Sequence, residues 1–142
     1  MHFVGIGGSF MLFEFSLSTP SSGMIDITDE VRNALKESGV NEGICIVYCP
    51  HTTAGITINE NADRDVASDI MHGLDIAFSE REDYKHCEGN SAAHIKSTVV
   101  GNEKTIIISK GRPVLGTWQG IFFCEFDGPR RRTFFVKVMN SL

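Results

Sequence analysis

The C-terminal third of the chain contains three strand-like segments in succession, with no helical pattern between them. They cover residues 104–109, 117–126 and 133–139, and the middle segment is apolar on both of its faces. Such a strand is expected at the centre of a sheet or beneath a partner subunit. Strands in runs, interrupted by only a few helices, predict an α+β fold with antiparallel pairing rather than a doubly wound parallel sheet.

Further strands are expected earlier in the chain. Phe13, Phe15 and Leu17 alternate with polar residues, and this period of two is typical of a half-buried strand. Residues 44–49 form an unbroken apolar run of strand length, which predicts burial on both faces. Residues 53–58 predict another strand close behind it.

Three helices are expected between these strands. The first has Thr28 as its N-cap and Gly39 as its stop signal, and the last has Ser91 as its N-cap and ends before Gly101. The second carries apolar residues four apart on the face expected to contact the core: Val66, Ile70 and Leu74. Three residues of the last helix are expected to face the core: Ala92, Ile95 and Val99.

The 142 residues suit a single domain, because neither a linker nor an internal repeat divides them. We expect this domain over residues 11–142, preceded by a flexible, glycine-rich lead-in over residues 1–10. The lead-in lacks the Lys-Ser/Thr ending of a phosphate-binding loop. No apolar stretch reaches the ~20 residues needed to span a bilayer, so no membrane contact is expected.

Charge and cysteine usage limit the expected partners and compartment. The formal net charge of −5 argues against broad nucleic-acid binding, so no nucleic-acid partner is expected. The arginines at 130–132 indicate either a solvated turn face or a holder of one small anion. The four cysteines show no CxxC spacing, and no signal peptide precedes them, which favours a reducing cytoplasm.

Three of the five histidines lie in short, polar, turn-forming stretches, HTTAG and HCEGNSAAHIK. Imidazole titrates near neutral pH and is the commonest metal ligand, so His51, His86 and His94 are candidate ligands of a divalent metal. Zinc is favoured over magnesium because the ligands are nitrogen atoms. Without a metal, His51 or His86 can accept a proton while Glu88 orients it. The alternative for each histidine is a hydrogen bond to the backbone at a turn.

Anion capture is a second possibility for the same stretches. Asn90, Ser91 and the free N–H groups at the start of the last helix favour phosphate, with Lys96 one turn away. Arg130 could add a planar fork for phosphate. Neighbouring polar stretches supply further hydroxyl and amide groups: Thr52, Thr53, Thr117 and Gln119. The alternative is that Ser91 only caps its helix.

Carboxylates are few among the candidates. Asp65 and Asp69 form an acidic stripe on the second helix, and a solvated face is the simplest interpretation of that stripe. Asp65 remains a candidate for acid–base work because it lies nearest the helix start and the polar turn that contains Asn61.

Three segments resemble, in order, the signature segments of the YjbQ/UPF0047 family, whose members are described as secondary thiamine-phosphate synthases. The segments are HTTAGITINENADRDV, HCEGNSAAHIKS and GRPVLGTWQGIFFCEFDGPR. The resemblance runs from about Met11 to the C-terminus. One departure is Arg64, where the family usually has proline, and it touches no proposed ligand.

The resemblance implies a compact antiparallel β-sandwich, jelly-roll-like and decorated with two or three helices, usually assembled as a homotrimer. It also implies one polar pocket that contains His51, Asp65 and Glu88, which we expect to be its catalytic residues. The same pocket is expected to contain the remaining matched motif residues: Asn61, His86, Asn90, His94 and Lys96.

The expected function is therefore that of a thiamine-phosphate-synthase-like enzyme, with this activity secondary and with no organic cofactor. The enzyme would join an aminopyrimidine diphosphate to a thiazole phosphate and release pyrophosphate. Carboxylates usually hold magnesium beside a diphosphate, and the candidate site offers only two of them, Asp65 and Glu88. This scarcity favours zinc-type chemistry such as hydrolysis. The alternative is a non-catalytic trimer that binds a metal or a small phosphorylated ligand.

Overall fold

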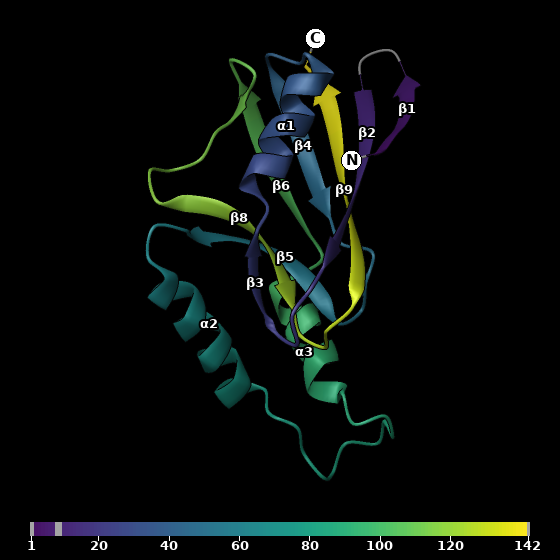
Figure 1. Ribbon diagram of the computed structural model, residues 1–142, viewed down its shortest axis with the longest axis vertical. Helices are drawn as coiled ribbons and strands as arrows, with labels where there is room; N and C mark the ends of the chain where they lie inside the picture. Colours follow the sequence, from purple (N-terminus) through teal and green to yellow (C-terminus); the bar gives the residue numbers. More distant parts are fainter. Residues whose placement is uncertain (1, 8–9, 142) are drawn as a thin grey trace.

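The computed structural model describes residues 2–7 and 10–141, with strands and helices mixed along the chain (Figure 1). The strands are β1 (His2–Gly7), β2 (Phe10–Ser18), β3 (Gly23–Asp26), β4 (Gly43–Tyr48), β5 (Ala54–Glu60), β6 (Glu103–Ser109), β7 (Arg112–Pro113), β8 (Gln119–Glu125) and β9 (Arg131–Asn140). The helices are α1 (Thr28–Ser38), α2 (Arg64–Ala77) and α3 (Ser91–Val100).

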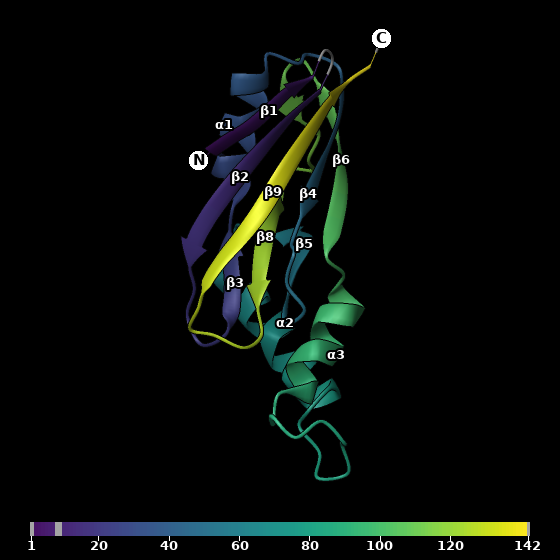
Figure 2. The same cartoon turned by 90° about the vertical axis from the view of Figure 1, so that its right-hand side faces the viewer.

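The strands form two antiparallel sheets that face each other. The larger sheet has the order β1-β2-β9-β4-β6-β7, and Figure 2 shows β2, β9, β4 and β6 side by side. The smaller sheet has the order β3-β8-β5, so β8 is its central strand, as its two apolar faces predict. The main core lies between the sheets and includes Phe13 and Val136 from one and Ile56 and Phe123 from the other. The predicted α+β fold with antiparallel sheets is confirmed.

Helix α1 packs against the same core through Val31, Ala34 and Leu35. Gly39 ends the helix in the left-handed conformation with φ 68°, as its position predicts. The predicted N-cap is wrong, because Thr28 is already the first helical residue. The Thr28 N–H donates to the Asp26 carboxylate at 2.9 Å instead, which satisfies one of the donors exposed at the helix start.

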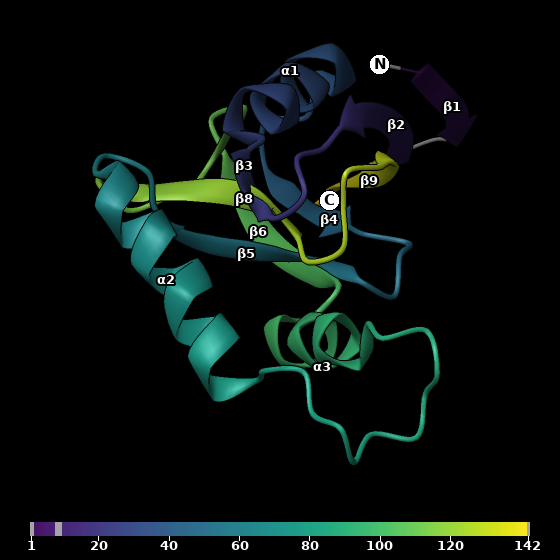
Figure 3. The ribbon, with the colours of Figure 1, turned by 60° about the horizontal axis from the view of Figure 1, so that its bottom comes forward.

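Helices α2 and α3 cover the outer face of the smaller sheet (Figure 3). They enclose a second apolar cluster that contains Phe122 and Phe126 of the β8 region and Ala93 of α3. No residue of α2 is fully buried, and its expected core residues are only half-buried: Val66, Ile70 and Leu74.

Helix α3 is rotated by about one residue from its expected orientation. Its buried residues are Ala92, Ala93, Lys96 and Ser97, whereas Val99 is 56% exposed. The cause of this rotation is a hydrogen bond. The Ser97 hydroxyl donates to the Ala54 carbonyl at 2.6 Å, which places that side of the helix against the sheet.

The expectation that residues 44–49 are buried on both faces is wrong. Cys45 and Val47 point into the core, but Ile44 is 37% and Tyr48 41% exposed. The outer face of the larger sheet has no covering layer within the described residues, since the helices lie on the other side of the molecule. Cross-strand neighbours extend the exposed apolar surface there, with Ile44 paired to Ile107 on one side and to Met139 on the other.

The N-terminal expectation also differs from the structure. Residues 2–7 form β1, which pairs with β2 in antiparallel fashion, whereas residues 1, 8 and 9 of the expected lead-in lie outside the described residues. The pairing satisfies backbone groups along the edge of β2 that would otherwise be exposed.

Candidate functional site

His51 lies directly after β4, and its imidazole is anchored to the backbone of β9. The Nε2 atom is 2.9 Å from the Thr133 amide nitrogen, which donates to it, and 3.1 Å from the Thr133 carbonyl oxygen. An accepting Nε2 leaves the proton of the neutral ring on Nδ1. Burial lowers the pKa of His51, and the charge of Arg132 lowers it further. Neutral His51 therefore presents a hydrogen-bond donor rather than the proton acceptor expected from the sequence.

A buried ion pair lies next to the backbone segment that anchors His51. Arg132 contacts both carboxylate oxygens of Glu125, with Nε 2.8 Å from Oε1 and Nη2 2.5 Å from Oε2. Burial alone would raise the pKa of Glu125, but hydrogen bonds from Arg132 and Thr19 outweigh it and lower that pKa. Arg132 also donates to the Thr53 hydroxyl at 2.8 Å.

This ion pair corrects two expectations. Arg132 is buried rather than part of a solvated turn face, and Thr53 is buried rather than open to a substrate. Glu125 and Arg132 were not among the predicted site residues. The available signal was a glutamate within an apolar strand, seven residues before an arginine, because a charge in such a strand needs a partner.

His51 and His94 line one cavity of about 460 Å³ between the start of β5 and helix α3. Thr52 lies at its wall, together with Ser97 and Thr98 of α3. The His94 ring makes no hydrogen bond with another described residue, so both of its ring nitrogens are available to a ligand. The structure thus brings together His51, Thr52 and His94 from two separate sequence segments.

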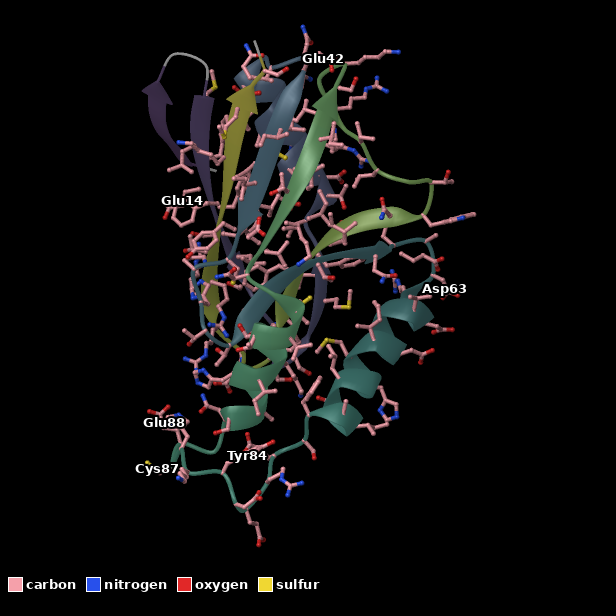
Figure 4. The ribbon with its side chains drawn as sticks, turned by 180° about the vertical axis from the view of Figure 1, so that it is seen from behind. Glu14, Glu42, Asp63, Tyr84, Cys87 and Glu88 are labelled. Atoms are coloured by element: carbon pink, nitrogen blue, oxygen red, sulfur yellow. The ribbon has the colours of Figure 1, made fainter. Side chains whose placement is uncertain are left out.

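His86 reaches His94 from the loop before α3. The two ring centroids are 5.6 Å apart with an interplanar angle of 87°, an edge-to-face contact. His86 Nε2 is 3.7 Å from Glu88 Oε2, and Figure 4 shows Glu88 and Cys87 on that loop. Ser91 and His94 line a second cavity there, of about 390 Å³. His94 therefore lies between two cavities.

The described residues contain no group of three or more His, Cys, Asp or Glu side chains that could hold a metal ion. His86 and His94 supply at most two imidazole ligands, and His51 Nε2 is engaged by Thr133. A four-coordinate zinc ion bound by both imidazoles would need two further ligands, such as water or substrate atoms.

Lys96 lies on the other side of α3 from His94, in a cavity of about 320 Å³. It is 9% exposed, and its ammonium pairs with Asp75 of α2. The α3 N-terminus at this cavity was expected to attract an anion. A carboxylate of the chain already occupies it, since the Ala92 N–H donates to Glu80 at 2.5 Å.

Asn90 and Arg130 converge on Asp127 at the same cavity wall. Asn90 Nδ2 donates to Asp127 Oδ2 at 2.9 Å, and Arg130 Nη2 contacts the same oxygen at 3.0 Å. The Asn90 hydrogen bond and then Arg130 lower the pKa of Asp127. Asn90 Oδ1 is buried and accepts no hydrogen bond from a described residue.

Four predicted site residues lie at the far end of the smaller sheet: Asn61, Asp65, Thr117 and Gln119. The β5–β8 ladder separates them from the histidines, because it pairs Glu60 with Gln119 at one end and Ala54 with Glu125 at the other. Six residue steps of strand span roughly 20 Å. Within one chain, these residues therefore do not share the His51–His94 cavity.

At that far end, Asn61 lines a separate cavity of about 630 Å³. Its Nδ2 donates to Asp26 Oδ2 at 3.2 Å. Gln119 Oε1 accepts from the Gly116 N–H at 2.8 Å. Asp65 is exposed at the start of α2, next to its cap residue Asp63. Trp118, between Thr117 and Gln119, is 62% exposed.

Comparison with known proteins identifies relatives over nearly the whole chain. The sequence model of the family described as "UPF0047 protein YjbQ-like" matches residues 13–141. A UPF0047 protein of Methanocaldococcus jannaschii is 54% identical over 132 residues, which cover 92% of this chain and 96% of the relative. The UPF0047 protein YugU of Bacillus subtilis is 54% identical over 124 residues, which cover 87% and 94%.

Solved structures match the fold as well. A yjbq/upf0047 family protein of Clostridium acetobutylicum superposes with a TM-score of 0.87 at 57% identity, covering 89% of this chain and 99% of its own. A YbjQ-like protein of unknown function from Sulfolobus solfataricus gives 0.88 at 32% identity, with 93% and 98% covered. Among the described residues, no helix has the length and apolar character needed to cross a membrane.

Proposed function

The chain belongs to the YjbQ-like UPF0047 family, and we propose that it is an enzyme that acts on a small phosphorylated molecule in the His51–His94 cavity. The observation that carries the proposal is the pairing of two imidazoles with different roles at one cavity. His51 is held by Thr133 as an Nδ1–H donor, whereas the His94 ring has no hydrogen-bond partner among the described residues.

This pairing suits general acid–base chemistry. His94 accepts the proton of an attacking water or hydroxyl, and His51 donates a hydrogen bond to an oxygen of the substrate. The Glu125–Arg132 pair positions His51 through the backbone of β9, because Thr133 follows Arg132 directly. Thr52 and Thr98 add hydroxyl groups at the cavity wall.

Thiamine-phosphate synthesis is the specific reaction that we propose to test. Release of pyrophosphate needs cations at the leaving group. Lys96 and Arg130 are the cations expected for this role, but each is already paired with a carboxylate, Lys96 with Asp75 and Arg130 with Asp127. This arrangement favours a weak, secondary synthase activity, with hydrolysis of a phosphate ester as the second reaction to assay.

The test measures thiamine phosphate and pyrophosphate formed from an aminopyrimidine diphosphate and a thiazole phosphate, and phosphate released from simple esters. We expect His94→Ala to lower the rate of phosphate-ester hydrolysis by about 100-fold or more, because that reaction needs a proton acceptor for the attacking water. His72→Ala is the matched control, because His72 is exposed on α2 and lines neither histidine cavity. Equal rates for wild type and His94→Ala would contradict the proposal. Tight ligand binding with no turnover would favour the non-catalytic alternative.

The alternative to the acid–base role of His94 is a divalent metal at His86 and His94, because a metal on one ring nitrogen of His94 leaves the other nitrogen protonated and unable to accept a proton. Two nitrogen ligands favour zinc over magnesium. In that case, metal analysis of the purified protein should find a stoichiometric ion in wild type and none in the His86→Ala/His94→Ala double variant. An unchanged metal content in that variant would place the ion elsewhere.

We also propose that the protein forms a homotrimer through the outer face of the larger sheet. Ile44, Ile107 and Met139 form an exposed apolar row across three strands, which is unfavourable in water. Ile107→Lys should dissociate the assembly in sedimentation velocity, whereas Ile76→Lys, at an exposed site on α2, should not.

The free, buried Cys45, Cys49 and Cys124 support a proposed cytoplasmic location.

A further inference from the structure

A further ligand-sized cavity lies at the end of the molecule opposite α3. It has a volume of about 660 Å³ and lies between the C-terminal end of α1 and the turn that joins β6 to β7. Figure 4 places Glu42, beside that turn, at the opposite end from Glu88 and Cys87. None of the residues proposed for the histidine site lines this cavity.

The charged side chains that line the cavity are all positive. Arg32 and Lys36 come from α1, and Lys110 and Arg112 come from the β6–β7 turn. Lys36, Lys110 and Arg112 form no ion pair with another described residue. The formal net charge of the whole protein is −5, so this concentration of cations runs against the overall composition.

The nearby carboxylates do not neutralise the cluster. Asp29 approaches Arg32 at 3.5 Å, but both side chains are exposed and solvent screens the pair. Glu42 is engaged by the turn itself, where it accepts hydrogen bonds from the Ser109 hydroxyl and the Lys110 N–H, each at 3.1 Å. Glu37 follows Lys36 on the helix but is not a lining residue.

The cations at this cavity repel one another, and a bound anion would relieve that repulsion. Arg32 and Lys36 are four residues apart on one helix face, where like charges repel. The C-terminal end of α1 carries roughly half a negative charge, which one cation would balance, so the helix does not account for four. A concave surface with charges of one sign also focuses the electrostatic field on its interior.

The floor of the cavity is apolar and is formed by Leu35, Val40 and Pro113. Leu35 and Val40 are fixed in the core, at 1% and 8% exposure. A suitable ligand therefore has an anionic group for the cationic rim and an apolar portion for the floor. The volume lies within the usual range for small-molecule sites, about 300–1,000 Å³.

We propose that this cavity binds a soluble phosphate monoester that carries an apolar or aromatic portion. Phosphate is favoured because guanidinium forks and ammonium groups together match its several oxygens. The site is separate from the histidine cavities, so its occupancy does not depend on the reaction proposed there.

Phenyl phosphate is the probe, titrated into isotope-labelled full-length protein and followed by amide NMR. We expect saturable shifts at Gly39 and Gly111, which line the cavity, and weaker or no binding of phenol. Arg112→Gln and Lys110→Asn should each weaken binding about tenfold. Asn suits position 110, because Lys110 has a φ of 54°, a conformation that Asn tolerates.

Arg81→Gln is the matched control, because Arg81 is an exposed arginine paired with Asp83 in the loop before α3. The Arg81→Gln variant should bind phenyl phosphate with the same affinity as wild type. An equal loss in Arg81→Gln would show nonspecific charge attraction and overturn the proposal. Shifts confined to Thr52 and His94, or sedimentation with phosphatidic acid vesicles without saturable phenyl phosphate binding, would also overturn it.

Discussion

The two ends of this molecule build their cavities in different ways. At the α3 end, His51 rests on a buried ion pair and α3 is fixed by a buried hydroxyl, so polar side chains hold the site from within. At the α1 end, four exposed cations lie above an apolar floor, and three of them have no ion pair with another described residue. The first cavity therefore depends on side-chain chemistry in the core, whereas the second depends on backbone shape and surface charge.

The largest expected effect is the loss of the buried ion pair. Glu125→Ala leaves Arg132 buried without its carboxylate, which should lower the free energy of unfolding by about 3–5 kcal/mol. Arg112→Ala at the other cavity should change it by less than about 0.5 kcal/mol. Urea unfolding of both variants measures the contrast, and similar losses in the two would remove the distinction between the ends.

A smaller effect is expected for the hydroxyl that orients α3. Ser97→Ala removes the hydrogen bond to the Ala54 carbonyl and leaves that acceptor without this partner, at a cost of about 1–3 kcal/mol. Thr98→Ala, an exposed neighbour whose hydroxyl donates within the helix, is the control and should cost less. Thermal unfolding of the two variants compares them directly, and equal costs would argue against a special role for Ser97.

Backbone shape should matter more than side chains at the α1 end. Gly39 adopts φ 68° with open space where a Cβ would lie. Gly39→Ala should therefore cost about 1 kcal/mol through the left-handed conformation alone. Gly39→Asn should recover part of that loss, because Asn tolerates this conformation. Chemical denaturation measures both, and a neutral Gly39→Ala would show that the helix end adjusts freely.

The smallest effect is a pH dependence confined to the α3 end. The lowered pKa of His51 means that the unfolded chain binds its proton more readily than the folded chain. This contribution to stability is complete above pH 6.5 and is lost as the pH falls from 6.5 through the lowered pKa. NMR titration of the imidazole should give a midpoint below 6.5. In the same pH window, His51→Gln should remove that part of the pH dependence of the free energy of unfolding. An NMR midpoint for His51 at or above 6.5 would contradict the buried, neutral ring.

Much of the fold was predictable because its signals are local. The alternation at Phe13, Phe15 and Leu17, the two apolar faces of β8 and the left-handed stop at Gly39 each indicate one element, and the structure has each of them. The predicted grouping of His51 with His94 also agrees with their shared cavity. Local pattern failed at residues 44–49, because burial of the second face depends on which layer lies above it.

The sequence by itself determined the family, the antiparallel α+β architecture and the histidine segments, since these follow from motifs and periodicity along the chain. Only the tertiary structure decided which motif residues meet. It placed Asn61 and Gln119 a strand length away from His51, used Arg132 to neutralise Glu125, and gathered four cations from two distant segments into one cavity. The physical reason is that pairing and burial depend on neighbours distant in sequence, which no local pattern specifies.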